Sequence, residues 1–416
     1  MEVLIIDPQF RNQSGHQFLY DMSLKSELEE RGASVFFLGN VLADKNCLAI
    51  DNFYPCLSDI ISDFFKQPVG LKSIKRIFGS IALLKNQFDN FFSYKFDFDK
   101  KKNSVIFLHS LYIFELLAFA WFLKQNFKIL IRGAHKIIIG FNFGFRRKSI
   151  LETSIMVFLY KYIFSWLVRG LEPQLIYFSD GRILAQDFQC LLRKEVHFIP
   201  APITNIFLEP YLNRERPNSF GNVVLTYVGG ARFNKGFDLF VEMIEGLLGE
   251  NGWSSKITVR AQIDVHNQQP DKDKLIMLEA ASALEALASK FGNIRIFRGG
   301  LSYHDYYDLI FTSDIIVLPY RQNLLKSAHS NIFREAVVLG KVPVVTSNTT
   351  MAEELLQRNL GDLTFDERRV SDFKEAVKKA IEKLSYYQER MSDIREEWIK
   401  IYSAKHLVDR INELVS

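Results

Sequence analysis

The sequence predicts an α/β protein made of two tandem doubly wound, Rossmann-like domains that face a cleft. Three observations lead to this prediction. Short apolar segments alternate with segments whose apolar residues recur with a 3.6-residue period, which is typical of parallel strands and their covering helices. The alternation runs twice along the chain, and a proline-containing stretch separates the two runs. At 416 residues, 48% of them hydrophobic, the chain can bury two separate cores.

The strand predictions rest on short, nearly continuous apolar runs. In the first half they fall at 3–6, 33–38, 104–109, 128–131, 174–178 and 196–199, and in the second half at 223–228, 256–261, 293–297, 314–319, 342–346 and 362–365. Helical periodicity is predicted between them, for instance over 17–30, 111–124, 271–291 and 331–339.

The predicted domain boundary follows the last strand of the first half. We place an N-terminal domain at 1–205 and a linker at 206–222, where Pro210 and Pro217 interrupt any regular period. A C-terminal domain is predicted at 223–385. Residues 386–416 are predicted to be helices that pack back toward the N-terminal domain.

A glycine loop follows the first strand of the second domain. Gly229 and Gly230 begin this loop, Arg232 and Lys235 follow, and a helical pattern begins at Gly236. Glycines let the backbone approach a ligand, and a helix N-terminus with nearby cations favours an anion. The loop is therefore a candidate phosphate site.

Several segments together resemble a known family. The segment 228–238 resembles the glycine-then-Arg-x-x-Lys-Gly segment that opens the donor domain of GT-B glycosyltransferases, especially family 4. Segment 313–320 is similar to the strand that leads to the family's donor pocket, and 331–345 to its Glu-Ala helix with the following Gly-Lys-Pro-Val-Val. Looser similarity covers 177–180 and 198–200.

The resemblance implies a retaining, metal-independent transferase that uses a UDP- or GDP-sugar and no cofactor. It implies that Arg232 and Lys235 hold the diphosphate and assist its departure, that Glu335 binds the ribose, and that the loop containing Gly15 faces the phosphates. A glycan or lipid-linked acceptor would bind the N-terminal domain. In agreement, no Asp-x-Asp pair stands at a predicted strand end where Mg²⁺ would bind.

One position departs from the family pattern. Members commonly carry two glutamates with seven residues between them; Glu335 matches the second, but Ser327 stands at the first. The segment around it is rich in hydroxyls and amides, so Ser327, Ser330 and Asn331 are candidate donor ligands. The departure leaves the donor sugar open.

Two histidines are candidate bases for the acceptor hydroxyl. His109 ends one predicted strand and His135 lies just past another, and an imidazole can accept a proton near neutral pH. The alternative for each is a histidine held in the core by the backbone.

Two other functions fit the same scaffold. A nucleotide-sugar epimerase would need paired acid and base residues around the sugar and no acceptor. A non-catalytic protein that binds nucleotide sugars is the other alternative, and Ser327 is the feature that favours it.

The overall composition limits the partners. A net charge of +4 without a nucleic-acid motif argues against nucleic-acid binding, and three cysteines without metal-ligand spacing fit a reducing compartment. The first residues enter a strand without a signal-peptide pattern, which predicts a cytoplasmic protein.

The 37 phenylalanines and the basic, aromatic segments 70–98 and 141–171 suggest peripheral contact with an anionic membrane on its inner face. The alternative is core helices with solvated basic ends.

Overall fold

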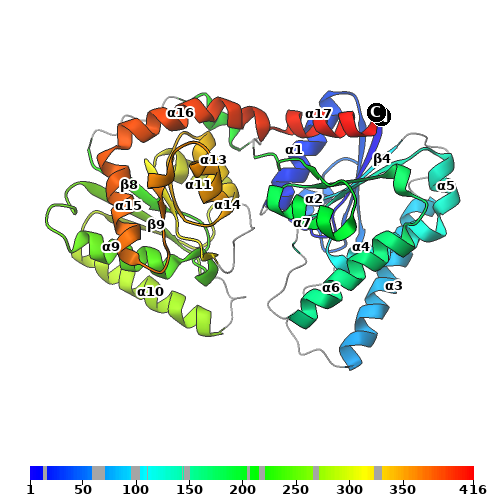
Figure 1. Ribbon diagram of the computed structural model, residues 1–416, viewed down its shortest axis with the longest axis horizontal. Coiled ribbons are helices and arrows are strands. Elements are labelled where there is room, and N and C mark those ends of the chain that lie inside the picture. The colour runs from blue at the N-terminus through cyan, green and yellow to red at the C-terminus, as the bar shows by residue number, and fades with distance from the viewer. Residues whose placement is uncertain are drawn as a thin grey trace. The chain divides into compact units, whose positions relative to one another are not determined.

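The computed structural model describes residues 1–12, 16–58, 71–94, 104–109, 111–142, 144, 150–203, 207–214, 221–265, 271–322 and 330–416. The chain divides into two compact units. Unit 1 comprises Met1–Pro202 with Ser403–Ser416, and unit 2 comprises Ile203–Tyr402. The last helix of the chain therefore belongs to unit 1, although the helix before it belongs to unit 2 (Figure 1).

Unit 1 is built on a seven-stranded sheet in the order β3-β2-β1-β4-β5-β6-β7, and every pairing is parallel. The strands are β1 (Glu2–Ile6), β2 (Ser34–Asn40), β3 (Phe53–Leu57), β4 (Val105–Leu108), β5 (Lys136–Gly140), β6 (Leu175–Ser179) and β7 (His197–Phe198). The helices are α1 (His16–Glu30), α2 (Lys45–Leu48), α3 (Leu71–Tyr94), α4 (Ile113–Gln125), α5 (Phe127–Arg132), α6 (Ile150–Tyr162), the π-helix η1 (Ile163–Leu167), the 3-10 helix η2 (Glu172–Gln174), α7 (Arg182–Leu192) and α17 (Ala404–Val415).

Unit 2 is built on a six-stranded parallel sheet in the order β10-β9-β8-β11-β12-β13. Its strands are β8 (Val223–Tyr227), β9 (Ile257–Ile263), β10 (Ile294–Arg298), β11 (Ile315–Leu318), β12 (Val342–Thr346) and β13 (Thr364–Phe365). The helices are α8 (Glu209–Leu212), the 3-10 helix η3 (Phe233–Lys235), α9 (Phe237–Leu248), α10 (Asp271–Lys290), α11 (Tyr303–Phe311), α13 (Asn331–Val338), α14 (Thr350–Leu356), the 3-10 helix η4 (Gly361–Leu363), α15 (Val370–Glu382) and α16 (Leu384–Ile401). Figure 1 shows α9, α10 and α15 on one face of the sheet and α11, α13 and α14 on the other.

Each sheet lies inside its own hydrophobic core. The strands β5 and β12 are apolar on both faces and almost fully buried, as expected for parallel strands covered by helices on two sides. The predicted class, two doubly wound α/β sheets, is confirmed.

One predicted strand is wrong. Residues 128–131 lie in helix α5, where the Leu130 and Gly133 N–H groups donate to the Asn126 and Ile129 carbonyls. The true strand is β5, eight residues further on, and β3 was not predicted at all. An apolar run as short as Phe127–Arg132 fits both the helical period of 3.6 residues and the strand period of two. The β-branched residues Ile137–Ile139 instead favour a pleated, fully buried strand.

The loop after β8 is fixed to the end of β11 by close backbone contact. Gly236, at φ 65°, ends η3 and precedes α9, and a Cβ added there would lie 1.9 Å from the Pro319 carbonyl oxygen. The Arg321 N–H donates to the Asn234 carbonyl, and the Arg321 guanidinium bonds both the Phe233 carbonyl and the Asp238 carboxylate. The loop thus has one position relative to the neighbouring strand.

We predict that Gly236→Ala destabilises unit 2 by more than about 3 kcal/mol, because the added methyl group cannot fit against Pro319. Gly252→Ala is the matched control. Gly252 also has a positive φ, 85°, but nothing lies within 4 Å of its added Cβ, so that change should cost about 1 kcal/mol. Urea unfolding followed by tryptophan fluorescence measures both. Equal losses would contradict the close contact.

Candidate active site

The predicted donor residues meet where the strand order of unit 2 changes direction. Strands β8 and β11 are neighbours in the sheet but far apart in sequence, so the chain leaves their carboxyl ends in opposite directions. Ligands of doubly wound sheets bind at such a point. The loop with Gly229 and Gly230 follows β8, and the segment that leads to α13 follows β11.

Gly229 provides space for two side chains from different elements. Its φ is 100°, and a Cβ there would lie 2.9 Å from Ile332 Cδ1 and 3.1 Å from Lys235 Nζ. The first turn of α13 and the Lys235 ammonium group therefore both lie against the backbone of this loop. The Gly229 N–H donates to Gln262 Oε1 at 2.8 Å, and the Gln262 amide donates to the Gly299 carbonyl, which anchors the loop to β9 and the end of β10.

Arg232 and Lys235 are two neighbouring cations that form no ion pair within the described residues. Arg232 Nε is buried without a hydrogen-bond partner among those residues, and it would lie 3.3 Å from a Cβ on Gly230. Burial, with a smaller contribution from the Arg232 charge, lowers the pKa of Lys235 to about 8, while Glu335 opposes the shift. Two close cations with only one carboxylate charge acting on Lys235 keep an excess of positive charge, which favours an anion.

Glu335 is held by two tyrosines that the sequence analysis missed. Tyr306 donates to Glu335 Oε2, and Tyr307 donates to Oε1 at 3.0 Å. The carboxylate is buried, which raises its pKa, whereas the two hydroxyls and the Lys235 charge act in the opposite direction. Each carboxylate oxygen has a further lone pair and can accept another hydroxyl. The adjacent tyrosines on the helix before β11 were the available sequence signal.

The N-terminus of α13 also lies at the carboxyl edge of the unit 2 sheet, beside the predicted donor residues. Ser330 caps the helix by accepting from the Phe333 N–H at 3.2 Å, and its Oγ lies 3.1 Å from the Tyr320 hydroxyl. Asn331 is the first residue of the helix, whose leading N–H groups have no intrahelical partner and favour an anion. Two predicted donor ligands, Ser327 and Gly15, lie outside the described residues.

His109 belongs to a buried polar cluster at the carboxyl edge of the sheet in unit 1. It directly follows β4, its Nδ1 lies 3.2 Å from Asp21 Oδ1, and its ring stacks on Tyr20 at 3.7 Å between centroids. Asp7, which follows β1, lies beside both, and the ligand atoms of Asp7, Asp21 and His109 are within 4.8 Å of one another. Among the described residues, only this group is compact enough to share a metal ion.

Burial controls the protonation of the Asp7–Asp21–His109 cluster. It lowers the pKa of His109 to about 4, although the Asp7 and Asp180 charges oppose this shift. Burial also raises the pKa of Asp21 to about 7 and that of Asp7 well above its ordinary value. At neutral pH the imidazole is therefore neutral and could accept a proton, but only 4% of the residue is exposed.

His135 is not brought to this edge. It precedes β5 rather than following a strand, and the Lys136 N–H donates to the Ser104 carbonyl at the amino ends of β4 and β5. Its ring fills the space above Gly133, where an added Cβ would lie 2.0 Å from Nε2. The misplaced strand 128–131 caused this error in the predicted location, and the geometry gives no support to a catalytic role.

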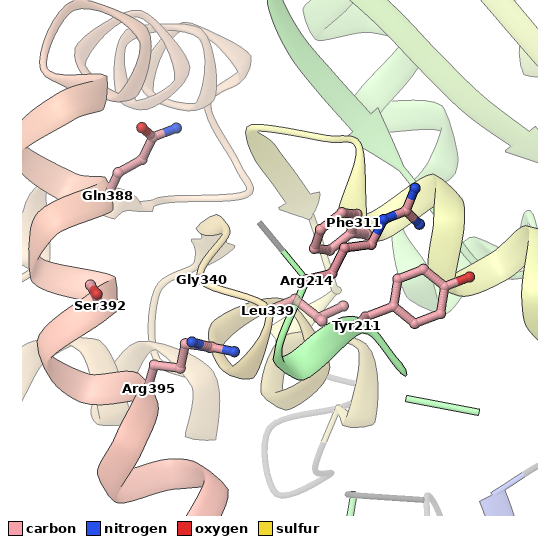
Figure 2. A pocket seen from close by; sticks show the side chains of 8 residues that line it. All are labelled: Tyr211, Arg214, Phe311, Leu339, Gly340, Gln388, Ser392 and Arg395. Carbon is pink, nitrogen blue, oxygen red and sulfur yellow. The ribbon is translucent and has the colours of Figure 1, made fainter. Parts of the chain in front are cut away.

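A separate pocket of about 250 Å³ opens at the opposite edge of the unit 2 sheet. Figure 2 shows its lining side chains, which come from α8 and the residues after it, the end of α11, the turn before β12, and α16: Tyr211, Arg214, Phe311, Leu339, Gly340, Gln388, Ser392 and Arg395. The Arg395 guanidinium already donates to the Val338 and Leu212 carbonyls, and Arg214 lies 3.6 Å from Asp308. This pocket lies at the amino ends of β11 and β12, away from the predicted donor residues.

No protein-family model and no curated protein matches the chain. Solved structures do match it in fold. The E. coli trehalose-6-phosphate protein bound with UDP-2-fluoro glucose is 11% identical, with a TM-score of 0.71 over 100% of this chain and 99% of that one. The N-terminal domain of Candida albicans trehalose-6-phosphate phosphatase is 11% identical, with a TM-score of 0.70 over 100% and 96%. The UDP-forming α,α-trehalose-phosphate synthase of Burkholderia vietnamiensis is 12% identical, with a TM-score of 0.68 over 100% and 99%.

The chain has the GT-B fold. This confirms the GT-B part of the resemblance. The family 4 part is not confirmed, because these neighbours are trehalose-phosphate proteins. At such low identity the likeness shows the fold alone.

The burial of the Asp7–Asp21–His109 cluster predicts how the free energy of unfolding depends on pH. Because burial raises the pKa of Asp21 to about 7 from an ordinary value of 3.8, the folded state binds this proton more tightly than the unfolded state. The contribution of Asp21 to stability should therefore fall as pH rises between about 4 and 7, by up to about 1.4 kcal/mol per pH unit, whereas His109, with its pKa lowered to about 4, contributes in the opposite direction over about pH 4–6.5. Asp21→Asn should remove this fall, so that its melting temperature relative to wild type increases with pH.

Thermal unfolding across pH 4.5–7.5 in buffer with EDTA tests this prediction. EDTA keeps cations from occupying the Asp7–Asp21–His109 cluster. Asp51→Asn, a change at an exposed position of the same unit, is the control and should follow the wild-type profile. An Asp21→Asn profile parallel to wild type would contradict the assignment.

Proposed function

We propose that this protein is a retaining, metal-independent glycosyltransferase that takes its sugar from a UDP- or GDP-sugar. The observation that carries the proposal is the cation pair Arg232 and Lys235, which forms no ion pair within the described residues and lies beside two glycines at the strand-order switch point of unit 2. The GT-B fold and the UDP-sugar held by one structural neighbour add support.

Each donor group has a matching protein group. Arg232 can bind phosphate oxygens in a bidentate manner, and Lys235 adds a point charge beside the Gly229 backbone. The N–H groups at the start of α13, with Ser330 and Asn331, are proposed to hold the remaining phosphate oxygens or the sugar. Glu335, oriented by Tyr306 and Tyr307, is proposed to accept the ribose hydroxyls.

The same cations serve the chemical step. As the anomeric carbon–oxygen bond breaks, negative charge accumulates on the departing diphosphate, and fixed cations stabilise that charge. The acceptor oxygen then attacks from the face that the diphosphate leaves, and its proton passes to a phosphate oxygen. Retention is supported by a structural neighbour, a trehalose-6-phosphate synthase described as transferring a glycosyl group with retention, 11% identical with a TM-score of 0.67.

The acceptor is proposed to be a glycan or a lipid-linked sugar bound at the carboxyl edge of unit 1. His109 ends β4 at this edge, and with Asp21 beside it, it is the proposed acceptor-side histidine. Contact with an anionic membrane through 70–98 and 141–171, of which 71–94, 141–142, 144 and 150–171 are described, is part of this proposal.

A nucleotide-sugar panel tests the proposal. Release of nucleoside diphosphate should require a matching donor and should increase with acceptor. An altered sugar without release would indicate an epimerase, and binding without turnover would indicate a non-catalytic protein; either result contradicts the proposal.

The double variant Arg232→Ala, Lys235→Ala should weaken binding of UDP or GDP by about 100-fold or more, since charge-assisted contacts contribute roughly 1.5–3 kcal/mol each. Isothermal titration calorimetry measures this loss. The double variant Lys256→Ala, Arg390→Ala removes the same charge elsewhere in unit 2 and should bind as wild type. Equal affinities in the two double variants would reject the assignment.

Binding should also depend on pH. With a pKa of about 8 in the free protein, Lys235 is charged below pH 8 and loses its charge above it. The affinity for nucleoside diphosphate should therefore fall above pH 8 by up to about tenfold per pH unit. Lys235→Arg should flatten this profile, because guanidinium stays charged. A wild-type profile that is flat from pH 7 to 9.5 would argue against contact between Lys235 and the diphosphate.

A further inference from the structure

Helix α6, with the π-helix η1 that continues it, is apolar on two opposite faces. The inner face packs into the core of unit 1 through Met156, Tyr160, Ile163 and Phe164, all buried. A surface helix of a globular protein normally has one apolar stripe and an opposite polar face. This helix departs from that rule.

The outer face carries a continuous line of large apolar side chains, which we call the α6 stripe. Its members recur every third or fourth residue and therefore share one helix face. They are exposed to the following extents: Leu151 69%, Ile155 49%, Phe158 66%, Tyr162 38% and Trp166 70%. Phe158 stacks on Tyr162 at 6.3 Å and Tyr162 on Trp166 at 6.2 Å, so the aromatic rings form one surface.

Exposed apolar surface of this kind marks a binding surface. Aromatic residues, particularly Trp and Tyr, favour the boundary between headgroups and acyl chains, where an apolar ring with a polar tip meets both environments. Within the described residues, no helix is long and apolar enough to cross a bilayer. The stripe therefore fits a helix that lies along the membrane surface.

The charges around the stripe are mixed, with basic residues in excess. Lys161 and Arg169 are exposed on this segment, and so is the acidic Glu152 in the first turn of α6. A hollow of about 530 Å³ adjoins it, lined by Lys161, Ser165, Asp187, Cys190, Leu191, Leu192 and Arg193. Helix α4 packs against both α3 and α6, and α3 adds the exposed Lys75, Arg76 and Phe78 to the same layer of helices (Figure 1).

We propose that the α6 stripe inserts into the interfacial region of an anionic lipid bilayer, with the neighbouring lysines and arginines on lipid phosphates. A second copy of this chain is a poorer partner for this surface, because symmetric pairing would place two basic surfaces against each other. A bilayer with anionic headgroups complements both the apolar line and the charge around it.

The inference deepens the proposed function in two respects: it names the surface that makes the proposed membrane contact, and it narrows the acceptor. A protein held at a bilayer by unit 1 meets lipid-linked acceptors at high local concentration, so the lipid-linked class is favoured over a free glycan. Membrane binding does not depend on the chemistry of the nucleotide-sugar donor. Experiments can therefore reject the membrane inference and the proposed transferase activity separately.

Vesicle flotation of the full chain tests the inference. Wild-type protein should float with vesicles of phosphatidylcholine that contain about 30% phosphatidylglycerol, should bind pure phosphatidylcholine at least about tenfold more weakly, and should lose binding in high salt. The double variant Phe158→Ser, Trp166→Ser should lose at least about tenfold in vesicle affinity. Its control is Leu275→Ser, Leu278→Ser, which removes exposed apolar residues from α10 in unit 2 and should bind as wild type.

Two accompanying measurements separate the possible failures. The far-UV circular dichroism and melting temperature of the Phe158→Ser, Trp166→Ser variant should match wild type, which shows that unit 1 is folded, and calorimetric titration with UDP and GDP should give unchanged affinities at unit 2. Light scattering after size exclusion should give the mass of one chain. Flotation unaffected by the variant, no flotation of wild type, or a dimer that Phe158→Ser, Trp166→Ser dissolves would each overturn the inference. Absence of nucleotide binding with intact flotation would reject only the proposed transferase activity.

Discussion

The contact between Gly236 and the Pro319 carbonyl constrains most of the candidate donor site. It leaves no space for a side chain, so the loop after β8 can lie in only one way against the end of β11. Arg321, three residues past the end of β11, reinforces this contact by bonding the loop backbone and Asp238 at the start of α9. Since the loop carries Arg232 and Lys235, their positions follow from a backbone contact and do not depend on a bound ligand. A site arranged before binding loses little free energy to ordering.

The candidate donor site carries an excess of positive charge that a bound diphosphate would neutralise. Lys235 lies near a second cation, Arg232, and faces Glu335, but the carboxylate is already held by Tyr306 and Tyr307. The lowered pKa of Lys235 shows that burial outweighs the single negative charge nearby. An anion placed between the cations and the N-terminus of α13 would raise that pKa and satisfy the buried Arg232 Nε.

The elements of unit 2 were predictable because the hydrophobic pattern of each segment matches its burial in the fold. Strands β8, β11 and β12 are short apolar runs, and helices α9 and α13 keep a clear helical period. Errors arose where a short apolar run fits both periods, as at 128–131, and this error moved His135 to the wrong end of its strand. Tyr306 and Tyr307 were missed for a different reason. Their approach to Glu335 depends on how α11 packs over the sheet, which periodicity does not encode. The exposure of Trp166 and Phe158 likewise required the fold, since a buried helix has the same sequence pattern.

The most direct test of the account is a double-mutant-type thermodynamic cycle. It removes the Glu335 carboxylate from the protein and the two ribose hydroxyls from the ligand, singly and together. Isothermal titration calorimetry would measure UDP and 2′,3′-dideoxy-UDP, with the guanosine pair in parallel, against wild type and Glu335→Gln. If Glu335 accepts the ribose hydroxyls, removing them should weaken wild-type binding by roughly 10- to 100-fold and should weaken the variant far less, because the two changes remove the same contact. Additive losses would place the ribose elsewhere. Failure of wild type to bind either nucleoside diphosphate would contradict the donor site as a whole.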